Sequence, residues 1–143
     1  MLLRAEKGYI LIGKDTDGIT MPHDLGWGSS RQKRQDEYFG RRSLFTPEAQ
    51  RRDRRQLVGL ESNGDVLPTG AHILANSDIK RSIGFVTSSY FSPNLQRPIA
   101  LALVEAGHSM YGQIVSIFNL GQEYSAKITN PCFIDPMGEK LNG

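Results

Sequence analysis

The chain has 143 residues, the length of one ordinary domain, and its formal net charge at pH 7 is only +2. No apolar run approaches the roughly 18 residues that a membrane-crossing helix needs, so we expect no membrane partner. A single cysteine, Cys132, excludes an internal disulfide and a cysteine-rich metal cluster, and it favours a reducing, cytoplasmic location.

The amino-terminal stretch 2–12 begins as a helical turn and becomes an apolar run. Its early charges and the lack of a small-residue cleavage site are not those of a secretory signal. Its apolar side chains need cover, so we expect them to pack on the barrel or on a second copy of the chain: Leu2, Leu3, Ile10 and Ile12. In the DTDG sequence that follows, Asp15 and Asp17 are spaced like paired acids, but a turn capped by its own Asp side chains is the favoured interpretation.

Positive charge is concentrated in residues 31–55, which hold nine Lys or Arg against four acids, whereas the rest of the chain holds eight against eleven. No base-stacking aromatic pattern, zinc-ligand spacing or helix-turn-helix accompanies these bases, so we do not expect a nucleic-acid partner. A solvated helix face or a docking surface for an acidic partner chain fits better. Within this region 38–54 predicts a helix, with Ser43 and Thr46 as candidate caps and Pro47 as a first helical residue.

From Gln56 onward, short strand-like runs alternate with turn residues. The predicted strands are 56–61, 71–76, 83–91, 98–104, 113–118 and 124–130. Even spacing of short strands is typical of a small barrel or sandwich. We therefore predict an α+β chain that is mainly an antiparallel six-stranded β-barrel, preceded by a short mixed helix and strand segment.

The run IALALV at 99–104 is apolar on both faces of its predicted strand. One face carries large side chains and the other small ones: Ile99, Leu101 and Leu103 against Ala100, Ala102 and Val104. This pattern predicts a central strand covered on both sides, with close packing on the small face. Pro93 and Pro98 make the preceding connection stiff, because proline fixes its own φ and cannot donate to a strand ladder.

Three segments together resemble one known family, the glycine-cleavage T-protein (aminomethyltransferase) superfamily. IGFVTSSYFSPNLQRPIALALVEAG at 83–107 is similar to the core sequence of its carboxyl-terminal barrel. LRAEKGYILIGKDTDGITMPHDLGWG at 3–28 resembles the L-R-x-E-x-G segment that precedes this barrel, and QLVGLE at 56–61 resembles the first barrel strand. The resemblance implies that 1–55 is a remnant of the preceding folate-binding subdomain plus a linking helix, and that 56–143 is the barrel.

Within the superfamily, DTDGITMPHDLGWG, VTSSYFSP and the tail NPCFIDPMGEKLNG are most similar to the carboxyl-terminal part of alpha subunits of heterotetrameric sarcosine oxidases. The resemblance implies a part of an oxidoreductase that oxidises sarcosine to glycine and passes the one-carbon unit to tetrahydrofolate. It implies a partial tetrahydrofolate site here, with FAD, FMN and NAD only in the complete enzyme. The alternative is a non-catalytic folate-binding or subunit-docking module of the same fold, such as a split aminomethyltransferase-like protein.

The implied partners are the rest of the alpha subunit and the other sarcosine oxidase subunits, and self-association of the isolated chain is a further expectation. We expect no catalysis by this chain alone, because no Gly-x-Gly-x-x-Gly dinucleotide fingerprint follows any predicted strand. The flavin, dinucleotide and first folate-binding portions of the alpha subunits have no counterpart in this sequence.

The resemblance implies three cofactor-binding candidates: Arg4, Glu6 and Trp27. Arg4 matches the family arginine that contacts folate, and a charged fork suits a polar heterocycle or a carboxylate. The alternative for Arg4 is a surface ion pair with Glu6 or Asp17. For Glu6, holding the local helix or orienting Arg4 is favoured over contacting the ligand. For Trp27, the alternatives are lining the pterin or the subdomain boundary and a simple packing role.

The other polar residues predict no catalytic centre. The three histidines, His23, His72 and His108, have no metal-ligand spacing. Ser88 and Ser89 lack a His-Asp pair, so we expect them to hold the strand by side-chain hydrogen bonds.

Residues near the carboxyl terminus depart from the family pattern. Phe133 and Ile134 occupy the neighbourhood in which the family often has a folate-contacting tyrosine. Cys132, between Pro131 and Phe133, is interpreted as a small buried residue.

Overall fold

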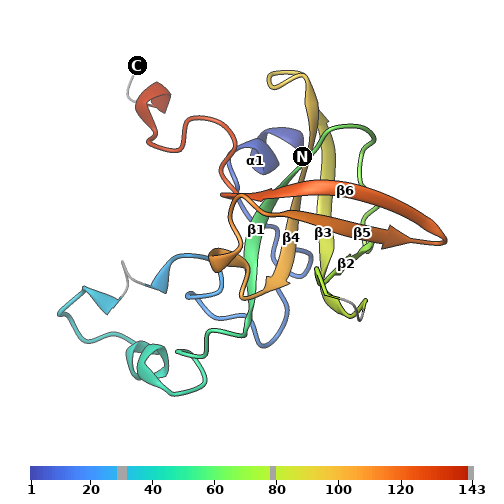
Figure 1. The fold of residues 1–143 in the computed structure, drawn as a ribbon. Helices are drawn as coiled ribbons and strands as arrows, with labels where there is room; N and C mark the ends of the chain where they lie inside the picture. Colours follow the sequence, from blue (N-terminus) through green and yellow to red (C-terminus); the bar gives the residue numbers. More distant parts are fainter. Residues whose placement is uncertain (29–31, 78–79, 142–143) are drawn as a thin grey trace.

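A computed structural model describes residues 1–28, 32–77 and 80–141 of the chain (Figure 1). The strands are β1 (Arg55–Ser62), β2 (His72–Leu74), β3 (Ser82–Ser92), β4 (Arg97–Glu105), β5 (Ile114–Asn119) and β6 (Gln122–Thr129). One α-helix, α1 (Leu2–Glu6), and three 3₁₀ helices, η1 (Arg41–Phe45), η2 (Gly107–Ser109) and η3 (Glu139–Leu141), complete the described elements. In the parts of the chain that the structure covers, no helix has both the length and the apolar character needed to cross a bilayer.

The six strands form a closed antiparallel barrel in the order β1-β4-β3-β2-β5-β6. Closure gives every strand two hydrogen-bonded neighbours, so the sheet has no free edge. β1 lies between β4 and β6, which come much later in the chain (Figure 1). The predicted barrel and its six strands are therefore confirmed, with small differences at the strand ends.

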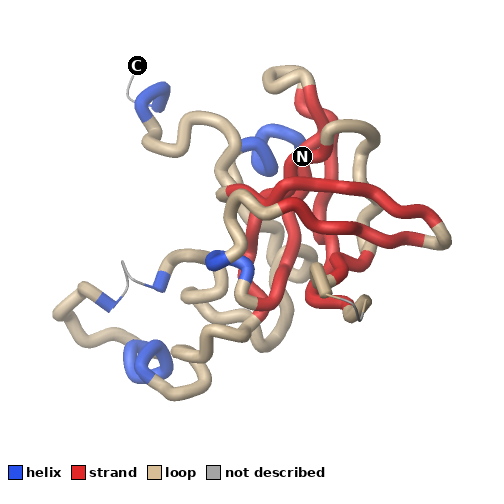
Figure 2. Tube along the Cα trace, in the orientation of Figure 1, coloured by secondary structure: helices blue, strands red, loops and turns tan. Residues whose placement is uncertain are grey.

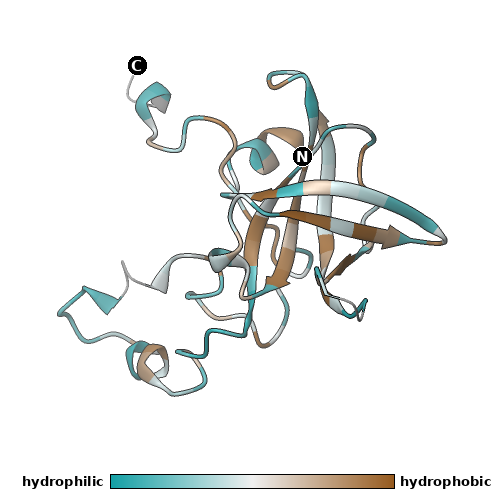
Figure 3. Ribbon diagram, viewed as in Figure 1, coloured by the Kyte–Doolittle hydropathy of each residue, from teal (hydrophilic) through white to brown (hydrophobic). Residues whose placement is uncertain are grey.

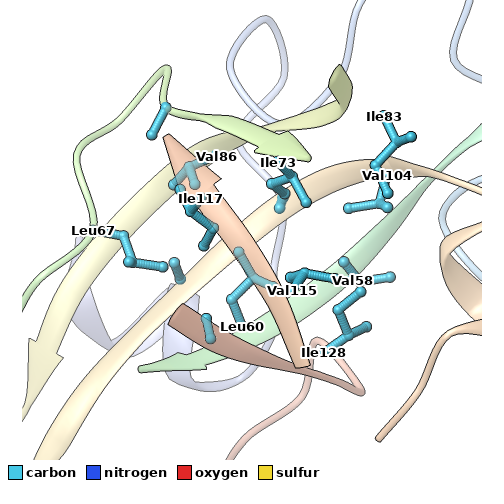
Figure 4. Packing of buried hydrophobic residues seen from close by; sticks show 14 residues of the cluster. Val58, Leu60, Leu67, Ile73, Ile83, Val86, Val104, Val115, Ile117 and Ile128 are labelled. Atoms are coloured by element: carbon cyan, nitrogen blue, oxygen red, sulfur yellow. The ribbon is translucent and has the colours of Figure 1, made fainter. Parts of the chain in front are cut away.

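The barrel interior is filled by apolar side chains from all six strands (Figure 4). β4 contributes its small face, Ala100, Ala102 and Val104, and these residues are at most 1% exposed. Larger residues from the facing strands fill the remaining space: Val58, Leu60, Ile73, Val86, Val115, Ile117 and Ile128. Small side chains on one strand leave room for large ones across a narrow barrel, as the alternation in IALALV predicts.

The large face of β4 packs on the outside of the barrel, against the amino-terminal segment. Leu101 and Leu103 form a second cluster with Leu57, against which Ile10 and Leu25 pack. The prediction that residues 2–12 pack on the barrel is therefore confirmed for Ile10. Two other residues of the predicted apolar face do not pack on the barrel, because Leu3 is 75% exposed and Ile12 is 86% exposed, and their packing on a second copy of the chain stays a prediction.

The basic region extends away from the barrel as an irregular excursion (Figure 2). Its 38–54 stretch contains only the 3₁₀ helix η1, which follows Gly40 at φ 82° and ends before Thr46. The predicted helix starting at Pro47 is wrong. Thr46 does accept a hydrogen bond from the backbone N–H of Ala49 at 3.3 Å, but only a turn follows. Figure 3 shows why no long helix is favoured here, since most of the excursion is hydrophilic and offers no continuous apolar face for packing.

Candidate functional site around Arg4 and Asp15

The outer face of β3 presents a row of hydroxyl groups to the amino-terminal segment. Ser88, Tyr90 and Ser92 are two residues apart, so their side chains point to the same face of the strand. The register between β3 and β4 shifts between Val86 and Ser88, which marks a β-bulge. In a regular strand two successive side chains point to opposite faces, but the bulge lets Thr87 and Ser88 both reach one acceptor.

That acceptor is the carboxylate of Asp15, which is completely buried. Its Oδ1 accepts hydrogen bonds from the hydroxyls of Thr87 and of Ser88, the latter at 2.8 Å. Its Oδ2 accepts from the backbone N–H of Leu11 at 2.9 Å and pairs with Arg4. Burial alone raises the pKa of Asp15, but the hydrogen bonds outweigh it and hold the pKa below its ordinary value. Asp15 is therefore a charged hub that joins the amino-terminal segment to β3.

Arg4, on α1, brings its guanidinium to this hub. Nη1 bonds Asp15 and donates to the carbonyl oxygen of Tyr9 at 3.1 Å. Nη2 donates to Ser88 Oγ at 2.7 Å and lies 3.5 Å from the hydroxyl of Tyr90. The side chain of Arg4 is 14% exposed, whereas that of Asp15 is fully buried. The expected surface pairing of Arg4 with Glu6 or Asp17 is wrong, because its partner is Asp15.

Glu6 lies two residues further along α1 than Arg4 and joins a separate network. Only 3% exposed, it accepts hydrogen bonds from the hydroxyl of Ser92 and from the side-chain amide of Asn94 at 3.0 and 3.2 Å. Glu6 does not contact Arg4 through any hydrogen bond in the described chain. It ties α1 to the stiff Ser92-Pro93-Asn94 connection that follows β3.

The contact between Ser92 and Glu6 predicts a measurable loss of stability in Ser92→Ala. We expect the free energy of unfolding to fall by about 1.5 kcal/mol, at the lower end for hydrogen bonds to charged groups, because Asn94 still serves the carboxylate. Urea denaturation measures this change. The matched control is Ser125→Ala on an exposed stretch of β6, which we expect to change stability by less than about 0.5 kcal/mol. Equal effects of the two substitutions would contradict the assigned role of Ser92.

Trp27 lines a hollow whose lining includes neither Arg4 nor Glu6. The hollow has a volume of about 480 Å³ and is also lined by Lys7, Tyr9, His108 and Cys132. His108 is half-buried at the wall of this hollow, and its burial lowers its pKa below the ordinary value. The indole is 44% exposed, so the hollow opens on a partly exposed aromatic side chain. The structure therefore places the three predicted site residues in three different surroundings, and cofactor binding by Arg4, Glu6 and Trp27 stays a prediction.

The turn interpretation of the DTDG sequence is right for one aspartate and wrong for the other. Asp17 Oδ1 accepts from the backbone N–H of Ile19 at 3.1 Å and from the hydroxyl of Thr20 at 2.7 Å, as a capped turn requires. Asp15 instead reaches across the chain to β3. The sequence alone does not indicate this contact, because Arg4, Thr87 and Ser88 come together around Asp15 only when the helix and the strand are packed side by side.

The predicted supporting role of the β3 serines holds for Ser88 and not for Ser89. Ser89 Oγ is buried and has no hydrogen-bond partner in the described chain. Of the histidines, His108 lies 3.2 Å from the carbonyl oxygen of Leu57, and His72 lies 3.1 Å from Ser82 Oγ. Among the residues that the structure describes, no group of three or more His, Cys, Asp or Glu side chains could hold a metal ion.

The fold and the site define a small closed barrel onto which an amino-terminal segment is docked by a buried charge network. Residues 55–135 match the family model described as the glycine cleavage T-protein C-terminal barrel domain. The chain therefore belongs to this family. The chain is also similar to the crystal structure of glycine cleavage system aminomethyltransferase T from Bartonella henselae, with a TM-score of 0.76 at 25% identity, covering 94% of this chain and 37% of that one.

Two kinds of curated protein are similar to almost the whole chain. The sarcosine oxidase alpha subunit of Corynebacterium sp. (strain P-1) is 34% identical over 99% of this chain, and that of Rhizobium meliloti (strain 1021) is 33% identical over the same share. The aminomethyltransferase of Picosynechococcus sp. is 31% identical over 92% of this chain. The chain spans 15% of the length of each of these alpha subunits and 36% of the aminomethyltransferase.

Proposed function

We propose that this chain acts as the carboxyl-terminal, tetrahydrofolate-side module of a sarcosine oxidase alpha subunit. In this proposal the complete enzyme oxidises sarcosine to glycine, and the one-carbon unit is captured on tetrahydrofolate. Family membership and similarity to alpha subunits over 99% of the chain support the proposal. The observation that carries it is the Arg4 guanidinium, which Asp15 and Ser88 hold in a fixed orientation on the outer face of the barrel.

The geometry at Arg4 suits one wall of a binding site for an anionic, partly aromatic molecule. An oriented guanidinium can recognise a carboxylate or a polar heterocycle, and both occur in a folate. Glu6 supports this wall by fixing α1, and Trp27 lines a hollow that includes Tyr9, whose carbonyl oxygen Arg4 bonds. A ligand pocket usually buries about 70–90% of its ligand, so we propose that other parts of a complete enzyme supply the remaining walls and bind FAD, FMN and NAD. Residues 1–55 would continue the preceding folate-binding subdomain.

The test is a calorimetric titration with tetrahydrofolate of two proteins. One is this chain alone. The other is a hybrid in which the chain replaces the matching segment of the alpha subunit from Corynebacterium sp. (strain P-1). We expect binding by the chain alone to be about millimolar or weaker, and binding by the hybrid to be far tighter, because only the hybrid surrounds the ligand. Neither sarcosine oxidation nor one-carbon transfer is expected from the chain alone.

Arg4→Lys in the hybrid tests the residue that carries the proposal. Lysine keeps a positive charge beside Asp15 but loses the planar fork, and we expect the affinity to fall roughly tenfold or more. The control is Arg97→Lys, which changes an exposed arginine paired with Glu61 at 2.9 Å. Micromolar binding by the chain alone that Arg4→Lys leaves unchanged would contradict this placement and would favour a self-sufficient binding module.

A further inference from the structure

The Arg4 network leaves one hydroxyl with a proton to donate. Tyr90 accepts a long hydrogen bond of 3.5 Å from Nη2 of Arg4, and the guanidinium carbon lies 5.9 Å from the centre of its ring. In the described part of the chain nothing accepts the hydroxyl proton of Tyr90 itself. The side chain is partly exposed on the outer face of β3, so it is accessible to a molecule bound there.

The terminal nitrogens of Arg4, in contrast, are already engaged. Each carries two hydrogens and each makes two contacts, with Tyr9 and Asp15 for Nη1 and with Ser88 and Tyr90 for Nη2. The Nε–H is buried and has no partner in the described chain. A ligand gains a terminal N–H of Arg4 only by replacing a protein acceptor, and the 3.5 Å contact with Tyr90 is the longest of the four.

We propose that Tyr90 is a ligand-contacting residue of this site and donates its hydroxyl hydrogen bond to the acceptor oxygen that Arg4 attracts. A phenol can accept from the guanidinium and donate to a ligand oxygen at the same time. A neighbouring positive charge strengthens such a bond when the acceptor is anionic. The ligand class is a carboxylate- or carbonyl-bearing molecule of the folate type, so the inference rests on the proposed function.

The test uses the full 143-residue chain, in which weak binding is measurable by ¹⁵N–¹H NMR. The probe is 5-formyltetrahydrofolate, and the signals followed are the Nε–H of Arg4 and the backbone amides of β3. Tyr90→Phe keeps the ring and its contact with the guanidinium but removes the hydroxyl. We expect the dissociation constant to rise roughly three- to tenfold, as for the loss of one hydrogen bond. The control Tyr124→Phe removes a hydroxyl that bonds Gln122 in the β5–β6 hairpin, and we expect no change.

A double-substitution cycle with Arg4→Lys tests whether the two side chains serve one acceptor. If they do, the combined loss of affinity differs from the sum of the single losses, because residues that share a contact are not additive. Additive losses, or a dissociation constant in Tyr90→Phe within twofold of the unsubstituted chain, would overturn the assignment of Tyr90. The absence of any shift at Arg4 and β3 in the unsubstituted chain would also overturn the assignment of Tyr90, whereas failure of the hybrid to bind tetrahydrofolate would overturn the proposed function itself.

Discussion

Asp15→Ala is expected to lower the free energy of unfolding by about 3–5 kcal/mol, the usual cost of removing one partner of a buried ion pair. The substitution leaves the guanidinium of Arg4 without its counter-charge at a site where it is only 14% exposed. It also leaves the hydroxyls of Thr87 and Ser88 without their shared acceptor. Urea denaturation followed by circular dichroism measures the loss. Because Asp15 joins sequence positions far apart, we expect the amino-terminal segment to become protease-sensitive as well.

The matched control is Asp17→Ala, two residues away in the same DTDG sequence. Asp17 is exposed and its hydrogen bonds stay within its own turn, so we expect a loss of no more than about 1 kcal/mol. Similar losses for the two substitutions would show that the buried network contributes little. A large loss for Asp15→Ala alone would show that the contact with β3 matters, since both variants remove one carboxylate from one turn.

The loss of stability in Asp15→Ala is expected to depend on pH. The pKa of Asp15 in the folded chain lies below its value of about 3.9 in an unfolded chain. The stability that Asp15 contributes is therefore fully present above pH 4–5, and it is lost as the pH falls through the folded pKa. We expect the stability difference between the unsubstituted chain and Asp15→Ala to be constant near neutral pH and to narrow in acid. A difference that widens in acid would contradict the assigned charge state.

The barrel could be predicted from the sequence because each strand carries its own local signal. The six runs are bounded by turn residues, and the alternation in Ile99–Val104 indicates both faces of β4 before any contact is known. The amino-terminal helix was also predicted. The helix predicted in 38–54 is longer than the one found there, which is the short η1. Cap residues such as Thr46 mark the start of a helix only where an apolar face can pack.

The Asp15 network could not be predicted, because it depends on contacts between distant residues. Thr87 and Ser88 would face opposite sides of a regular strand, and only the bulge in β3 turns both toward Asp15. The alternation of Ser88, Tyr90 and Ser92 was present in the sequence as a hydroxyl-bearing strand face. What the sequence did not indicate is that this face meets α1, so the partners of Arg4 and Glu6 were predicted within the local segment.

Gly84→Ala is expected to destabilise the barrel by about 3 kcal/mol or more, since the collision is with backbone and not with a flexible side chain. A Cβ at Gly84 would strike the carbonyl oxygen of Leu103 and lie 2.9 Å from the Cα of Val104. Both atoms belong to β4, and Gly84 is paired with Val104 in the β3–β4 ladder and with Ile73 in β2. Relief therefore requires the ladder to open where three strands meet.

Gly64→Ala separates this steric effect from the general consequences of replacing glycine. Gly64 lies in the turn after β1, where a Cβ would meet no heavy atom within 4 Å and the backbone is not left-handed. Alanine there restricts the unfolded chain, so we expect stability to stay the same or to rise by up to about 1 kcal/mol. Urea denaturation of both variants measures the contrast. If Gly84→Ala unfolds within about 1 kcal/mol of the unsubstituted chain, then β3 and β4 do not approach as closely as described. In that case the bulge that aims Thr87 and Ser88 at Asp15, three residues further along β3, loses its structural basis.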